Sequence, residues 1–119
     1  MDSKKIKKIV KSIFVKHGLS DAHAEISSNY LTQAELVGAP SHGLARLKMY
    51  CNRIKKKLIN CKPKIKIKKI SQSIIHIDAN NAIGFVAADL AIKKAISCAK
   101  KTGIGLVGIK NSGHYGLSS

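Results

Sequence analysis

The chain has 119 residues, 45% of them hydrophobic, and carries 22 Lys and Arg against 6 Asp and Glu, which gives a net charge of +16. This length allows one domain with a substantial core, and the apolar share excludes a disordered chain. The charge raises the possibility of a nucleic-acid-binding module. However, nearly all the basic residues are Lys, whereas phosphate and base recognition favours Arg, and 4% aromatic residues are too few for a base-stacking platform. The composition therefore argues against nucleic acid as a partner, and a small basic binding module is kept as the alternative interpretation.

Targeting signals and disulfides are not expected. Lysines interrupt the apolar residues near the N-terminus, so no signal-peptide core forms, and no apolar run approaches membrane-spanning length. Cys51, Cys61 and Cys98 show no CxxC spacing, which favours free thiols over a disulfide framework or a zinc site. These features predict a cytoplasmic protein with no membrane partner.

The first part of the chain predicts three amphipathic helices. Apolar residues recur at helical spacing over residues 3–18, behind Ser3 as a possible cap, and over residues 20–38, behind Ser20 or Asp21. After a Gly-Ala-Pro break, a third helix is predicted from about Gly43 to Ile59. Its expected core-facing stripe comprises Leu44, Leu47, Cys51, Ile54 and Leu58.

The pattern changes after Asn60. Lys and Ile alternate over residues 64–68, as in an edge strand with one solvated face. A second strand is predicted over residues 74–77, a helix over 84–101 and a buried strand over 104–109. The expected organisation is therefore α+β, with a boundary between residues 60 and 63. Residues 1–62 form a helical subdomain, and residues 63–119 form an incomplete β-β-α-β unit.

Residues 103–108 spell GxGxxG, the pattern of a dinucleotide-binding loop. That fingerprint requires a strand before the glycines and a helix after them, because the helix N-terminus holds the pyrophosphate. Here a predicted helix precedes the glycines and a strand follows. The sequence therefore favours a helix C-cap at Gly103 and close strand packing over a cofactor site.

The segment Ser41–Arg46 (Ser-His-Gly-Leu-Ala-Arg) is predicted to open the third helix, with Ser41 as its cap. His42 would then lie at the helix N-terminus, with Arg46 one turn further along the same face. Arg binds a carboxylate bidentately, and His exchanges a proton with the neighbouring oxygen. The pattern suits recognition of a 2-oxo acid. A helix cap flanked by a surface His and Arg is an equally good interpretation.

His114 lies in a Gly- and Ser-rich loop, residues 111–116, directly after the last predicted strand. Sites are commonly built on such loops, although a single His there is more often a structural hydrogen-bonding group. No two of the five His residues show an i, i+4 spacing, so no metal site is predicted. Because a closed domain rarely ends on such a loop, the chain is expected to be truncated.

Taken together, these segments resemble the malate/L-lactate dehydrogenase family, which includes archaeal-type malate, sulfolactate and ureidoglycolate dehydrogenases. The resemblance rests on the order and spacing of several short motifs along most of the chain. The matching segments are residues 34–38, 41–47 with Met49 and Tyr50, Asp78 with the turn at 81–84, 103–105 and 111–116.

The resemblance implies an oxidoreductase that interconverts small 2-hydroxy and 2-oxo acids with NAD or NADP as cofactor. It also implies a homodimer in the full-length family. The implied fold is an N-terminal helical subdomain followed by the start of an α/β-sandwich nucleotide-binding domain that is not a Rossmann fold.

The resemblance also implies roles for four residues. Arg46 would hold the substrate carboxylate, with support from Ser41, and His42 would line the substrate site. The family's catalytic acid/base corresponds to His42 in some members and to His114 in others. We favour His114 as the acid/base and His42 as a group that polarises the carbonyl.

Family members are roughly three times longer than this chain, beyond the single-domain size considered above. The resemblance therefore implies an N-terminal fragment that lacks most of the nucleotide-binding surface. We expect it to show no measurable dehydrogenase activity by itself and to be either inert or dependent on a complementary chain. The sequence does not determine the substrate or the choice between NAD and NADP.

Overall fold

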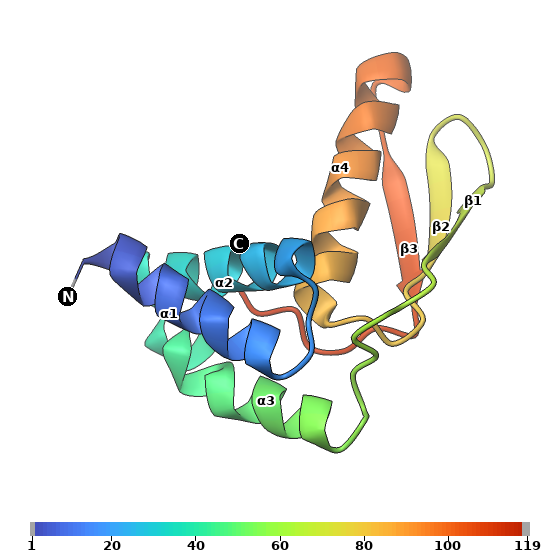
Figure 1. Cartoon of the computed structure of the whole chain (residues 1–119). Coiled ribbons are helices and arrows are strands. Elements are labelled where there is room, and N and C mark those ends of the chain that lie inside the picture. The colour runs from blue at the N-terminus through green and yellow to red at the C-terminus, as the bar shows by residue number, and fades with distance from the viewer. Residues whose placement is uncertain (1, 118–119) are drawn as a thin grey trace.

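The computed structural model describes residues 2–117 and has the α+β organisation that the sequence predicts. Three helices lie together in one half of the molecule, and a three-stranded sheet with a fourth helix stands beside them (Figure 1). The helices are α1 (Ser3–Lys16), α2 (Asp21–Leu36), α3 (Leu47–Lys55) and α4 (Gly84–Thr102), and the strands are β1 (Lys66–Lys69), β2 (Ile74–Asp78) and β3 (Leu106–Lys110).

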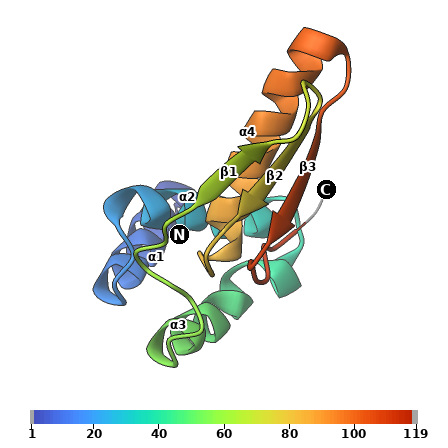
Figure 2. The same ribbon diagram turned by 90° about the vertical axis from the view of Figure 1, so that its right-hand side faces the viewer.

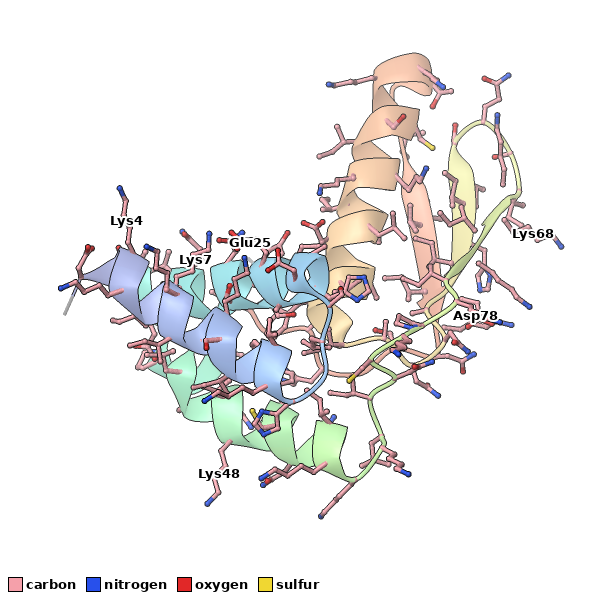
Figure 3. The ribbon with its side chains drawn as sticks, in the orientation of Figure 1. Lys4, Lys7, Glu25, Lys48, Lys68 and Asp78 are labelled. Carbon is pink, nitrogen blue, oxygen red and sulfur yellow. The ribbon has the colours of Figure 1, made fainter. Side chains whose placement is uncertain are left out.

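Helices α1 and α2 form an antiparallel pair with capped N-termini. The α1 cap is Asp2, whose side chain accepts a hydrogen bond from the Lys4 N–H, so Ser3 is the first helical residue and not the cap. Ser20 caps α2 as predicted, accepting from the His23 N–H at 3.2 Å. Lys7 of α1 and Glu25 of α2 form an ion pair on the solvent side (Figure 3).

The third predicted helix is shorter than expected at both ends. Residues 40–42 and 44–46 form two 3₁₀ turns, and regular α-helix starts only at Leu47. Pro40 fits the first turn, but Gly43 (φ −101°, ψ −132°) is far from helical and separates the two turns. At the other end, Lys57 is left-handed (φ 60°), which turns the chain away. Leu58 is consequently 63% exposed, and its predicted place in the core is wrong.

The sheet has the order β1-β2-β3, with β1 antiparallel to β2 and β2 parallel to β3. Helix α4 connects the two parallel strands and covers one face of the sheet (Figure 2). Ile77, on the covered face, is fully buried, whereas every residue of β1 is exposed, as expected for a lysine-rich edge strand. The prediction that the third strand is buried is wrong. Four of its five residues are exposed, because α4 covers only one face and no described strand pairs with its outer edge.

The main core joins the two halves. It contains residues of the helical half together with three residues at the start of α4, and Phe14, Leu31 and Tyr50 are among its fully buried members. Its buried residues are Val10, Phe14, Leu19, Ala24, Leu31, Tyr50, Ile54, Ile83, Phe85 and Val86. The core therefore crosses the predicted boundary near residue 62, and the division into two domains stays a prediction.

The GxGxxG segment has the structural role that the sequence favours. Gly103 ends α4 in the left-handed conformation (φ 88°), where glycine is the preferred residue. A Cβ atom at Gly105 would lie 2.0 Å from the carbonyl oxygen of Ala95, so this glycine allows the chain leading to β3 to pass close to α4. Neither glycine opens a helix, and the segment is not a phosphate-binding loop.

Candidate active site

The two candidate histidines meet although they come from distant segments. His42 lies in the first 3₁₀ turn before α3, and His114 lies in the loop after β3. Their rings face each other at 22° with centroids 6.2 Å apart. The chain reaches this position because the segment after β3 runs back to the helical half (Figure 1). Both histidines are half-buried, so they remain within reach of a ligand from solvent.

The His114 loop is held in place by main-chain contacts at the start of α4. A Cβ atom at Gly84 would lie 2.0 Å from the carbonyl oxygen of His114, so only glycine permits this approach. The Asn81 N–H donates to the Asn111 carbonyl at 2.8 Å, and the Asn111 amide donates to the Asp78 carboxylate at 3.0 Å. The loop position is therefore fixed by its own residues and by the turn between β2 and α4.

The Ser41–Arg46 segment is ordered differently from the prediction. Ser41 does not cap a helix. Its carbonyl accepts a hydrogen bond from Arg46 Nε at 2.9 Å, and its Oγ lies 3.1 Å from His42 Nδ1. Ser41 and Arg46 are thus in contact through the main chain, and their predicted roles toward a substrate stay a prediction. The hydrogen bond at Nε leaves the terminal nitrogens of the half-buried Arg46 guanidinium available to a ligand. Nη1 makes only a weak contact, at 3.9 Å, with Met49 Sδ.

Glu35 of α2 stabilises the same segment through a hydrogen bond to its main chain. Its carboxylate accepts a hydrogen bond from the Leu44 N–H at 2.9 Å. A Cβ atom at Gly43 would lie 2.7 Å from the same carboxylate oxygen, so the close approach again needs glycine. The Glu35 carboxylate thus takes the position that a helix cap would otherwise fill, which explains how the two 3₁₀ turns are stabilised.

Tyr50 is the closest side-chain partner of His114. Its Oη lies 2.6 Å from His114 Nδ1, and the Gly116 N–H donates to the same nitrogen at 3.2 Å. The Tyr50 side chain is 1% exposed and packs against Phe85, with ring centroids 4.9 Å apart. Burial raises the pKa of Tyr50 to about 12, although Arg46 and Arg53 act in the opposite direction, so the phenol stays protonated.

The environment of His114 favours its neutral form. Partial burial lowers the pKa of His114 below its ordinary value of 6.5, and the positive charges of Arg46, His42 and Arg53 lower it further. His114 is therefore uncharged at neutral pH. A neutral imidazole beside a guanidinium suits a site that binds an anion and exchanges or donates a proton at an adjacent oxygen.

A small polar cavity of about 100 Å³ adjoins His114. Tyr50, Arg53 and Ser112 contribute polar groups to its wall, and a Cβ atom at Gly113 would lie 3.8 Å from Arg53 Nη1. Sequence reasoning gave no role to Tyr50, Arg53 or Glu35. A usable signal was present, because positions 46, 50 and 53 have the i, i+4, i+7 spacing of one helix face.

A larger groove of about 460 Å³ lies between α2 and α4 and contains none of the four predicted site residues. Its lining is mostly apolar and includes Val37, Phe85 and Ile92. The candidate catalytic residues therefore lie outside this apolar groove.

No group of three or more His, Cys, Asp or Glu lies together within residues 2–117 in a way that could hold a metal ion. No helix in this part of the chain is long and apolar enough to cross a membrane. The first residue of α4 packs against the main chain of the His114 loop, and the GxGxxG segment is not a phosphate cradle. Neither of these two segments therefore forms a phosphate-binding helix start.

Comparison with known proteins gives a consistent result. A family model described as malate/L-lactate dehydrogenase matches residues 1–119. The chain is 39% identical over 101 residues to malate/(S)-sulfolactate dehydrogenase of Methanothermus fervidus, covering 85% of this chain and 30% of that protein. It is 40% identical over 106 residues to malate dehydrogenase of Pyrococcus abyssi, covering 89% of this chain and 29% of that protein.

Among solved structures, malate dehydrogenase from Pyrococcus horikoshii OT3 superimposes with a TM-score of 0.95 and 34% sequence identity. The alignment covers 98% of this chain and 34% of that structure. The chain thus spans about a third of the length of the proteins it resembles.

Proposed function

This chain belongs to the malate/L-lactate dehydrogenase family, and from that premise we propose that it supplies substrate-binding and proton-transfer residues for the interconversion of 2-hydroxy and 2-oxo acids. The observation that carries the proposal is the meeting of His42 and His114, 6.2 Å apart, beside the half-buried guanidinium of Arg46. A carboxylate next to a carbonyl or hydroxyl oxygen is the ligand that this arrangement would recognise.

In this proposal Arg46 binds the substrate carboxylate, and the Ser41 carbonyl orients it through the hydrogen bond to Nε. His114 is the acid/base at the 2-oxygen, and His42 polarises the same oxygen. The neutral state of His114 at neutral pH and its place opposite the His42 ring support this assignment. Substrate binding brings a negative charge, which would raise the pKa of His114 and favour its proton-donating form.

The cofactor proposed from the family resemblance is NAD or NADP, which supplies a hydride when bound. Since neither the GxGxxG segment nor the start of α4 forms a cradle for its pyrophosphate, we assign no cofactor contact to the described residues. For the same reason we propose that the chain by itself has no measurable dehydrogenase activity. Oxidation of NADH or NADPH by the purified chain, with a panel of 2-oxo acids, would contradict this.

The resemblance also carries three broader proposals. Residues 63–117 would begin an α/β-sandwich nucleotide-binding domain of non-Rossmann type, which agrees with the structural role of the GxGxxG segment. The complete protein would be a homodimer. A cytoplasmic location is supported by the three free cysteines, since disulfides are rare in reducing compartments.

The nucleic-acid alternative finds no support in the family membership. The lysines that suggested it are distributed over several elements, and Lys4 on α1, Lys48 on α3 and Lys68 on β1 point in different directions (Figure 3).

The proposal is tested by titrating the chain with oxamate, an unreactive analogue of a 2-oxo acid, and following the His114 and His42 ring protons by NMR. We expect saturable shifts of both rings. Arg46→Gln should weaken binding about ten- to 100-fold, the range for a lost charge-assisted hydrogen bond.

The matched control is Lys48→Gln, which removes one positive charge from the exposed side of the neighbouring turn. It should change the oxamate affinity less than twofold. Equal weakening in both variants would show that only net charge matters and would exclude Arg46 as the carboxylate-binding residue.

A further inference from the structure

We infer that Tyr50 is a positioning residue that, together with the Gly116 N–H, anchors Nδ1 of His114 and leaves Nε2 carrying the proton, so that His114 meets a substrate as a neutral hydrogen-bond donor. The first part of this inference concerns the protein alone. The part about substrate rests on the proposed function, and the experiment separates the two.

Two hydrogen-bond partners of Nδ1 determine which ring nitrogen of His114 carries the proton. A main-chain N–H only donates, so the contact from Gly116 at 3.2 Å requires an unprotonated Nδ1 with a free lone pair. The Tyr50 hydroxyl, 2.6 Å from the same atom, then donates as well. A neutral imidazole with an accepting Nδ1 carries its hydrogen on Nε2. The tautomer is thus set by two partners.

The alternative tautomer would lose one of these partners. With hydrogen on Nδ1, the Tyr50 hydroxyl could rotate and accept, but the Gly116 N–H would face another N–H. Gly116 is itself constrained, since its φ is 86° and a Cβ atom there would lie 2.7 Å from Cε1 of Phe85. Phe85 is buried and packs against Tyr50. The two donors are consequently held by the same part of the core.

The charged groups around the ring act in the same direction. Arg46 and Arg53 on the α3 side and His42 opposite the ring all oppose a positive charge on His114. Within residues 2–117, no acidic side chain is among the groups that shift the pKa of His114. The resting ring is therefore neutral, and the hydrogen-bond geometry then selects between its two neutral forms.

This tautomer distinguishes the two forms of substrate. The carbonyl oxygen of a 2-oxo acid accepts a hydrogen bond from Nε2–H, which polarises the carbonyl. Removal of a proton from a 2-hydroxyl would instead require a free lone pair at Nε2, which the resting tautomer lacks. The unliganded site is accordingly in the tautomer that favours binding of the 2-oxo acid over the 2-hydroxy acid.

The tautomer can be read from ¹⁵N–¹H long-range correlation spectra of the wild-type chain at pH 7.5, where the two ring nitrogens of His114 give distinct shifts. We expect one neutral species with protonated Nε2 and unprotonated Nδ1. A spectrum with the proton on Nδ1, or with a charged ring, would overturn the inference, whatever the outcome of oxamate binding.

Tyr50→Phe removes only the hydroxyl and keeps the buried ring. We expect the single tautomer to become a mixture and the pH midpoint of His114 to rise by about 0.4 to 1 unit, because a hydrogen bond to the neutral form is lost. Tyr30→Phe is the control, since the Tyr30 hydroxyl bonds to Asp89 and should leave His114 unchanged. Retention of the wild-type tautomer and midpoint in the Tyr50 variant would exclude the positioning role.

Oxamate and L-lactate then test the part that rests on the proposed function. Oxamate should bind several-fold more tightly than L-lactate to the wild-type chain, and Tyr50→Phe should reduce this ratio. If the Nε2 tautomer is present but neither compound binds, the proposed function fails and the positioning role stands. If oxamate and L-lactate bind equally tightly, the inferred preference of the site for the 2-oxo acid is wrong.

Discussion

The helical half and the sheet half of the molecule bury their apolar residues to different extents. Phe14, Ala24 and Leu31 in α1 and α2 are fully buried, and the helices cover one another on the core side. In the sheet, only Ile77 is buried to that degree, while Ile67 and Ile109, its neighbours across the strands, are 46% and 39% exposed. The helical half thus shields its apolar side chains from solvent, whereas the sheet is covered by a helix on one face only.

This difference explains where the candidate site is ordered. His114 belongs to the sheet half by sequence, but its partner Tyr50, which packs against Phe85, is part of the core that joins the two halves. The loop after β3 is thus held by the core through Tyr50 as well as by Asp78 at the end of β2. A perturbation of the core should therefore reach the site, whereas a perturbation of the exposed side chains of the sheet should not.

The largest expected effect comes from the closed core. Phe14→Ala should destabilise the chain by about 3–5 kcal/mol, because it removes a fully buried aromatic side chain and leaves a cavity. Ile109→Ala, on the half-covered strand, should cost about 1 kcal/mol or less, because that side chain already contacts water. Urea denaturation measures both. Similar losses in the two variants would contradict the contrast between the two halves.

An intermediate effect is expected where the His114 loop meets α4. Gly84→Ala would place Cβ against the His114 carbonyl, and overpacking of this kind costs about 1–3 kcal/mol. It should also shift the His114 ring resonances, because the loop must move. Gly108→Ala is the matched control on β3, where the nearest atom to a new Cβ, in the His76 ring, is 3.6 Å away. If both variants behave alike, the Gly84 contact does not position the loop.

Much of the fold could be predicted from local pattern. Apolar periodicity and the Ser20 cap predicted α2, and the Lys-Ile alternation predicted an exposed edge strand at β1. The third helix was predicted to begin too early because the apolar periodicity includes Leu44 and Leu47, whereas the backbone at Gly43 is not helical. Burial of β3 failed for a different reason. An apolar sequence is compatible with a buried strand, but whether the strand is buried depends on which helices and strands pack against its faces and edges.

The sequence singled out the residues of the candidate site but not the contacts between them. The resemblance singled out Ser41, His42, Arg46 and His114, and the structure places these residues in one region. The hydrogen bond between Tyr50 and His114 joins residues 64 positions apart, and the Glu35 carboxylate replaces a cap that the sequence assigned to Ser41. Such contacts depend on tertiary packing, which spacing along the chain does not encode.

The smallest expected effect is electrostatic and compares one histidine from each half. The pKa values of His23 in α2 and His114 are both lowered, His23 by burial alone and His114 by burial together with Arg46, His42 and Arg53. In the unfolded chain these histidines take up a proton near pH 6.5, whereas in the folded chain they do so only at a lower pH. Each histidine therefore contributes stability above pH 6.5, and this stability is lost as the pH falls through its lower pKa in the folded chain.

Salt distinguishes the two causes. Raising the ionic strength from about 0.01 M to 1 M shortens the Debye length from roughly 30 Å to 3 Å and screens the charge–charge part, but it does not change burial. The midpoint of His114 in an NMR pH titration should therefore rise by on the order of a few tenths of a pH unit, and that of His23 should stay constant. Arg46→Gln should reproduce part of the rise at low salt. Equal responses of the two histidines to salt would mean that the site does not concentrate positive charge around His114.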